Sequence, residues 1–98
     1  MNNKKIRGWI IRILERAYPL GLEGQNIHKQ LHELGYAMTK KDFDANISYL
    51  IEDKFVEIKK FGNEFEFADD ILSNKIYKLT TKGIDLAEKS ITDDGVEL

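Results

Sequence analysis

Two histidines, His28 and His32, stand four residues apart and could hold a metal ion from one face of a helix. Glu33 follows directly, but the His-Glu-x-x-His order of a zinc hydrolase is absent, and no third ligand has a recognisable spacing. Each histidine comes one position after an apolar residue, Ile27 or Leu31, so we expect both to flank a buried stripe and to face solvent. The sequence therefore predicts no metal site.

The serines and the paired carboxylates also lack the setting that catalysis requires. No serine stands in a Gly-x-Ser-x-Gly sequence. Asp69-Asp70 and Asp93-Asp94 are neighbours in turn-like or tail-like sequence, where two carboxylates seldom share a protected cleft. Gly21-Leu-Glu-Gly24 has too few glycines to cradle a phosphate. We therefore expect no enzyme and no cofactor.

The net charge of -2 is not that of a strongly basic nucleic-acid binder, but the charges are unevenly distributed. The first sixteen residues hold five basic residues and one acidic residue, which gives 5 − 1 = +4. Residues 62–74 hold four acidic residues and no basic one, which gives -4. A DNA-facing surface should therefore lie toward the N-terminal helix, the third helix and the lysines beside the expected hairpin, Lys59 and Lys60.

The 98 residues suffice for one domain with its own core, and we expect residues 1–91 to form it. Residues 92–98 should be an exposed, acidic and flexible tail. No cysteine is present, so a reducing cytoplasm is the simplest location. The N-terminal apolar cluster is interrupted by Arg12, which favours an amphipathic helix over a signal peptide or a membrane span.

Three helices are expected first. Residues 6–18 repeat apolar side chains at i, i+3, i+4 and i+7, and Pro19 should end that helix. Residues 25–34 resume the spacing, and Gly35 stands where a left-handed cap is favoured. A connector that includes a short extended segment should join the two helices.

The third helix is expected over residues 40–53. Thr39 and Asp42 are spaced as a capping box, with Asp in place of the usual Glu or Gln. Only a short turn, residues 35–38, separates this helix from the one before it. The two therefore form a helix-turn-helix pair by spacing alone.

Strands and a last helix should follow. Residues 55–61 read as a strand, Gly62-Asn63 as a hairpin turn, and residues 64–67 as a returning strand or an extended wing. Residues 69–74 could hold one helical turn. Residues 75–79 predict the final strand, and Thr80 is a natural N-cap for a helix from Thr81 to about Ser90.

This order resembles the winged helix-turn-helix superfamily, an α+β, mostly α fold with three helices, a β-hairpin wing and a C-terminal helix. Leu50-Ile-Glu-Asp-Lys-Phe-Val-Glu-Ile58 resembles the exit of the recognition helix into the first wing strand, with Lys54 where glycine is common. Tyr77-Lys-Leu-Thr-Thr-Lys-Gly83 resembles the Tyr-x-Leu-Thr-x-Lys-Gly exit of the second wing strand in bacterial regulators similar to the PadR and MarR families. Thr81 stands there in the usual place of proline.

The resemblance implies a DNA-binding transcriptional regulator, of bacterial or phage type, with helix 40–53 as the recognition helix. Phe43, Ile47, Leu50 and Ile51 should turn inward. The expected DNA contacts are Lys40, Lys41, Asp44, Ala45, Ser48 and Tyr49 on the helix, with Lys59 and Lys60 beside the hairpin. The resemblance also implies a homodimer through helix one and residues 81–91.

The alternative is a winged-helix protein-interaction or phage assembly module that does not bind DNA specifically. Phe65 and Phe67 lie among Glu64, Glu66 and two aspartates, a poor surface for a phosphate backbone but a suitable one for a basic partner. The simpler interpretation is that both phenylalanines point into the core. The sequence leaves this choice open, because fold does not decide activity.

Overall fold

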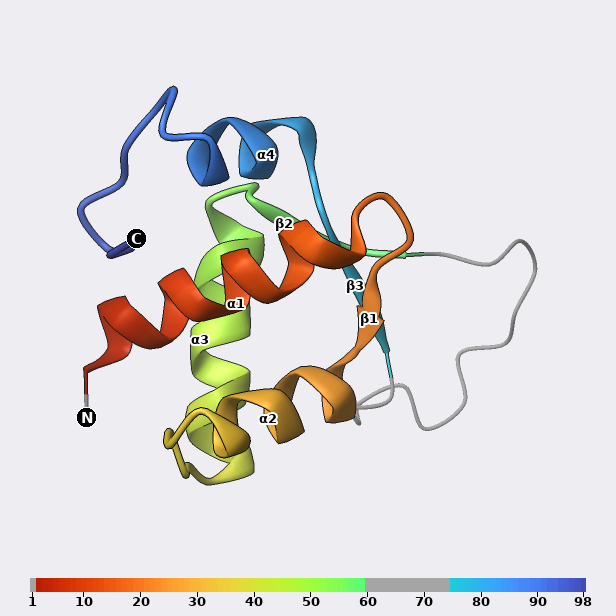
Figure 1. The fold of residues 1–98 in the computed structure, drawn as a ribbon, viewed down its shortest axis with the longest axis vertical. Helices are drawn as coiled ribbons and strands as arrows, with labels where there is room; N and C mark the ends of the chain where they lie inside the picture. The colour runs from red at the N-terminus through yellow and green to blue at the C-terminus, as the bar shows by residue number, and fades with distance from the viewer. Residues whose placement is uncertain (1, 60–74) are drawn as a thin grey trace.

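The computed structural model describes residues 2–59 and 75–98, and these form a small α+β fold that is mostly helical (Figure 1). Four helices and one three-stranded antiparallel sheet occur in this part of the chain. In chain order the elements are α1 Asn3–Ala17, β1 Leu22–Glu23, α2 Gly24–Glu33, α3 Lys40–Glu52, β2 Val56–Ile58, β3 Ile76–Leu79 and α4 Thr81–Ala87. The expected turn at Gly62-Asn63, the segments 64–67 and 69–74, and both Phe65 and Phe67 lie outside the described residues.

The central helix of the fold is α1, which crosses α3 and packs against α2, α4 and β3 (Figure 1). Asn2 caps it by accepting a hydrogen bond from the Lys5 backbone N–H at 3.1 Å. Its apolar stripe is at most 3% exposed and consists of Ile6, Ile10, Ile11, Ile13 and Leu14. The helix ends at Ala17, one residue before the end near Tyr18 that Pro19 predicts.

The turn between α2 and α3 confirms two predictions from the sequence, a left-handed Gly35 and a capping Thr39. Gly35 has a φ of +98°, in the left-handed region that glycine adopts without steric cost. Thr39 caps α3, because its hydroxyl accepts a hydrogen bond from the Asp42 backbone N–H at 3.1 Å. Phe43, Ile47 and Leu50 are fully buried, whereas Ile51, expected to point inward, is only half-buried.

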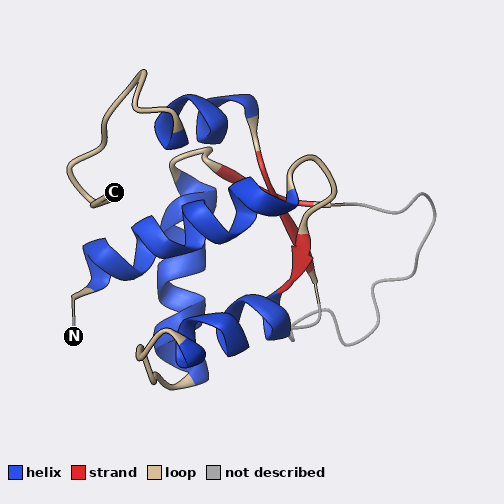
Figure 2. Ribbon diagram, in the orientation of Figure 1, coloured by secondary structure: helices blue, strands red, loops and turns tan. Residues whose placement is uncertain are grey.

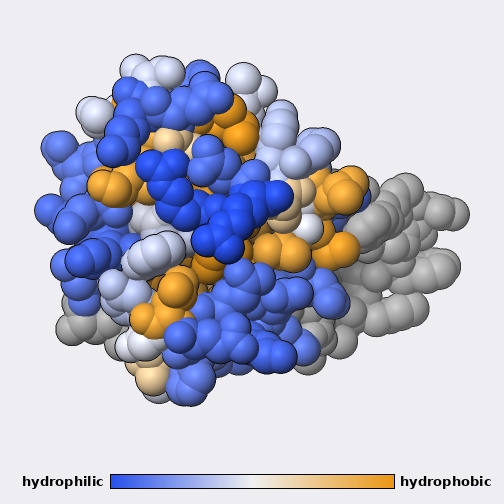
Figure 3. All heavy atoms as spheres, viewed as in Figure 1, coloured by the Kyte–Doolittle hydropathy of each residue, from blue (hydrophilic) through white to orange (hydrophobic). Residues whose placement is uncertain are grey.

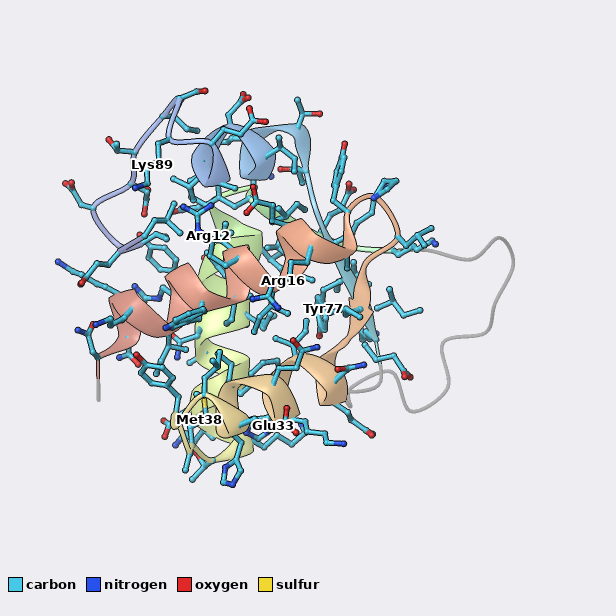
Figure 4. The ribbon with its side chains drawn as sticks, viewed as in Figure 1. Arg12, Arg16, Glu33, Met38, Tyr77 and Lys89 are labelled. Atoms are coloured by element: carbon cyan, nitrogen blue, oxygen red, sulfur yellow. The ribbon has the colours of Figure 1, made fainter. Side chains whose placement is uncertain are left out.

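The sheet has the order β1-β3-β2, with β3 in the centre (Figure 2). Leu22 of β1 pairs with Tyr77 of β3, and Val56 of β2 pairs with Leu79 on the other side. Tyr77 is fully buried and points from β3 toward the helices (Figure 4). The extended segment expected between the first two helices therefore forms a strand, β1, at the edge of the sheet among the described residues.

The left-handed residue after α3 is Lys54, with a φ of +70°. The Phe55 N–H donates to the Leu50 carbonyl and the Lys54 N–H to the Ile51 carbonyl, both at 3.0 Å, which is the hydrogen-bond pattern of a Schellman cap. Lys54 is the residue that replaces glycine in the first motif. The backbone keeps the conformation that favours glycine, although the side chain is not glycine.

The two sequence motifs pack against each other. The Thr80 hydroxyl donates to the Lys54 carbonyl at 2.6 Å and accepts from the Gly83 N–H at 3.0 Å, so it caps α4 and ties that helix to the end of α3. A Cβ at Gly83 would collide with the Phe55 carbonyl oxygen. The helix ends earlier than expected, at Ala87, because Lys89 is left-handed and the Ser90 N–H turns back to the Asp85 carbonyl.

Candidate nucleic-acid interface

One strip of α3 stays outside while the opposite side fills the core. Lys41, Ala45 and Glu52 are exposed and Ser48 is half-buried, at the i, i+4, i+7, i+11 spacing of one helix face. We call these four residues the α3 strip. Ala45 and Ser48 are short, so the strip allows a close approach to the helix backbone, while its ends carry opposite charges.

Lys40 and Asp44 neutralise each other beside this strip. The Lys40 Nζ lies 3.1 Å from the Asp44 Oδ2, and their side chains are 49% and 24% exposed. The other Asp44 oxygen is buried, with no hydrogen-bond partner in the described part of the protein. Burial raises the pKa of Tyr77 to about 12, and the negative charge of Asp44 adds to the shift. Asp44 is thus partly turned inward.

Tyr49, predicted as a DNA contact, is held by the C-terminal segment. Its hydroxyl donates to the Asp93 Oδ2 at 2.8 Å. The Arg7 guanidinium carbon lies 3.9 Å from the centre of the Tyr49 ring, a cation–π contact. The hydrogen bond to Asp93 is the main reason that the pKa of Tyr49 is raised to about 12.

The N-terminal basic residues are partly used inside the protein. Arg7 donates from Nε to the Asn46 Oδ1 at 3.0 Å and from Nη1 to the Gly95 carbonyl at 3.1 Å. Arg12 reaches from α1 toward α4, where its Nη1 donates to the Ala87 carbonyl at 2.7 Å (Figure 4). The charge of +4 in the first sixteen residues is therefore only partly available to a partner, because Arg7 and Arg12 bond within the protein. Arg16 and the first two lysines of α1 are exposed.

The network around Arg7 includes a buried amide. Asn46 is 2% exposed and lies on the inner side of α3. Its Nδ2 donates to the Asp42 carbonyl at 3.0 Å and to the Asn3 Oδ1 at 3.3 Å, while its Oδ1 accepts from Arg7. The polar atoms of this side chain are thus satisfied by α1 and by α3 itself.

Residues 92–98 lie against the helices, which corrects the expectation of an exposed tail. Val96 is 9% exposed, and the Glu97 N–H donates to the Lys4 carbonyl at 3.0 Å. Gly8 makes this approach possible, because a Cβ there would collide with the Glu97 carbonyl oxygen. No sequence pattern marks these contacts, because the seven residues are rich in acidic residues and turn formers and carry no periodic signal.

The remaining predicted contacts are separate from the helix. Lys59 follows β2, is half-buried, and its backbone N–H donates to the Ile76 carbonyl at 2.8 Å. Lys60 lies outside the described residues. The structure therefore places six of the predicted residues on α3 and a seventh at the end of β2.

The histidines differ from each other. His32 is exposed as expected, but His28 is half-buried, which corrects the prediction that it faces solvent. Its ring stacks on Phe43 with centroids 5.0 Å apart, and its Nε2 lies 3.0 Å from the Met38 carbonyl oxygen. Among the residues that the structure describes, no three histidine or acidic side chains are close enough to hold a metal ion.

Comparisons with known proteins assign the chain to no family. No protein-family model matches the chain, and no curated protein or solved structure is significantly similar to it. The helices in the described ranges are too short or too polar to cross a membrane. Figure 3 shows a surface that is largely hydrophilic on the side viewed, with separate small apolar areas.

Proposed function

We propose that this protein is a DNA-binding winged-helix protein, a transcriptional regulator, in which α3 is the recognition helix. The observation that carries the proposal is the α3 strip, which remains outside although Phe43, Ile47 and Leu50 of the same helix fill the core. The short turn to α2 and the contact between the two motifs support the same reading. In a helix-turn-helix protein, such a second helix enters the major groove.

The chemistry of the α3 strip and of the neighbouring Lys40 fits that role. Lys40 and Lys41 in the first turn of α3 would contact phosphates, which position the protein, and Ser48 would donate to a phosphate or a base edge. Ala45 would touch a thymine methyl. The ion pair between Lys40 and Asp44 does not prevent this, because Lys40 is 49% exposed and ion pairs near the surface contribute little, so that Lys40 can exchange Asp44 for a phosphate.

Binding by one copy should be weak and dependent on salt. Three or four phosphate contacts correspond to a slope of about -3 to -4 in log K against log salt. We propose that two copies bind together, through α1 and residues 81–91. Trp9 on α1, together with Ile84 and Ile91, is only half-buried and supplies apolar surface for such a dimer.

The test compares two matched lysine pairs, each in the first turn of a helix. Replacing Lys40 and Lys41 with Gln should weaken binding to duplex DNA and reduce the salt slope by about 2. Replacing the exposed pair Lys4 and Lys5 with Gln changes the net charge equally and serves as the control. Equal losses in both double variants would contradict α3 as the recognition helix.

A protein-interaction or assembly module is the second candidate. The observation that favours it is the loop between α1 and β1, where Tyr18 is 45% and Leu20 69% exposed. Replacing both with Ser should leave the melting temperature unchanged but abolish capture of a partner from the source cell. If capture persists, this loop is not the binding surface.

A further inference from the structure

We propose that residues 92–98, which we call the C-terminal strap, compete with DNA phosphates for the C-terminal half of α3. When docked, the strap engages the hydrogen-bond donors of Tyr49 and Arg7, and when released it leaves both for a phosphate. This inference rests on the proposed DNA-binding function. The strap is therefore an autoinhibitory element.

Two glycines, Gly8 and Gly95, lie at the contacts of the strap and leave the space in which it docks. Gly8 lies inside α1, where glycine is less favourable than alanine. It is the position at which the Glu97 carbonyl oxygen touches the helix, so that a Cβ has no room there. Gly95 faces Tyr49 in the same way, because a Cβ at Gly95 would collide with the hydroxyl of the tyrosine.

The strap supplies the kind of acceptor that a phosphate would supply. Tyr49 donates to the Asp93 carboxylate at 2.8 Å, and Arg7 donates to the Gly95 carbonyl at 3.1 Å. These two donors lie together, because the Arg7 guanidinium stacks on the Tyr49 ring. Arginine and tyrosine side chains are common donors to the DNA backbone. A phosphodiester has two free oxygens and could accept from both.

The strap also lies next to the α3 strip. Tyr49 follows Ala45 by four residues, so the two are neighbours on the surface of the helix. Asp93 and the exposed Asp94 thus bring negative charge close to the surface that would face DNA. A docked strap opposes binding in two ways, by occupying the donors and by repelling phosphates.

The contacts that hold the strap are few enough to be reversible. Besides the hydrogen bonds from Tyr49 and Arg7, the strap is held by one buried apolar side chain, Val96, and by one hydrogen bond from the Glu97 N–H to the Lys4 carbonyl. Affinity for DNA is reduced by the fraction of molecules in which the strap is released. Weakening the strap should therefore raise the affinity, without any change in the residues that contact DNA.

The experiment compares Asp93→Ala with Asp94→Ala, which change the net charge equally but differ in contact with Tyr49. We expect Asp93→Ala to bind a duplex about three- to tenfold more tightly than Asp94→Ala, as a released strap would allow. Gly8→Ala should act like Asp93→Ala, because it displaces Glu97 while favouring the helix. Amide exchange of Glu97 in the free protein reports docking, and circular dichroism confirms folding.

Each outcome separates the two proposals. Equal DNA affinity of the two aspartate variants, with faster Glu97 exchange in Asp93→Ala, would overturn the competition and leave the DNA-binding proposal intact. Unchanged Glu97 exchange in both Asp93→Ala and Gly8→Ala would also overturn it, because the strap would not have been released. Absence of binding in every protein, the unmodified chain included, would overturn the DNA-binding function and the competition together.

Discussion

At its N-terminal end α3 is open to solvent, with Lys40 and Lys41 exposed, whereas farther along the same helix Tyr49 is covered by the C-terminal strap. The start of the helix at this open end is set locally, by a Thr39 cap that accepts a hydrogen bond from a residue three positions ahead. The cover on Tyr49 comes from Asp93, 44 residues away in sequence, while Glu52 in the same half of the helix is exposed. The exposed lysines and the covered Tyr49 thus lie on the same amphipathic helix. They differ because the C-terminal strap packs on Tyr49, which the pattern of apolar residues in the helix does not indicate.

The largest effect on stability should come from the covered half. Gly95→Ala would drive a methyl group into Tyr49 and undock the strap. The free energy of unfolding should fall by about 2 kcal/mol, from the exposure of Val96 and the loss of hydrogen bonds. Urea denaturation measures this, with Asp94→Ala as the control. A loss no greater than that of the control would show that the strap adds nothing to stability.

A smaller effect is expected at the open end. Thr39→Ala removes the hydroxyl that accepts from the Asp42 N–H, and should lower the free energy of unfolding by about 1 kcal/mol. Thr39→Ser keeps the hydroxyl and should behave nearly as the unmodified protein. Thermal denaturation of the three proteins checks this, and equal losses for Ala and Ser would argue against a capping role.

The exit from α3 can be compared with the exit from α2, since both end in a left-handed residue. Lys54→Gly should raise the free energy of unfolding by about 0.5–1 kcal/mol, because glycine adopts φ of +70° without strain. Gly35→Lys places lysine in the same setting and should lower it by a similar amount. If Lys54→Gly is destabilising, the Lys54 side chain must contribute a contact that outweighs the strain.

The smallest effect concerns pH. Because the folded pKa of Tyr49 is about 12 and the ordinary value is 10.0, its neutral form contributes stability below pH 10 that is lost as the pH rises toward 12. The difference in tyrosinate absorbance between the protein and Tyr49→Phe gives this pKa. In Asp93→Ala the pKa should fall toward 10, because the hydrogen bond to the carboxylate is gone. A value that does not move would contradict the contact.

Local features were predictable from sequence. Pro19 ends α1, Gly35 is left-handed, and Thr39 and Thr80 cap their helices, because each effect involves residues within a few positions of one another. The sequence also shows that Lys54 stands where glycine is common, but only the structure shows that the backbone there is left-handed.

Contacts between distant residues could not be predicted. The sequence suggests that Arg7 and Arg12 are free surface charges, but they donate to the backbone carbonyls of Gly95 and Ala87, and no sequence pattern marks such an acceptor. His28 was expected in solvent, yet it stacks on Phe43 across the helix pair. The sequence indicates the helix on which we propose the site, but it does not indicate that the C-terminal segment covers Tyr49 on that helix.

The buried amide of Asn46 has a consequence for how α3 is aimed. An apolar core tolerates some rotation of one helix against another, because hydrophobic contacts are not directional. The hydrogen bonds from Asn46 to Asn3, Asp42 and Arg7 are directional, and a rotated helix would leave them unmade in a dry interior. The orientation of the α3 strip is thus fixed by the Asn46 amide on the opposite side of the helix. A substitution at Asn46 could rotate the strip away from a bound partner without contacting that partner.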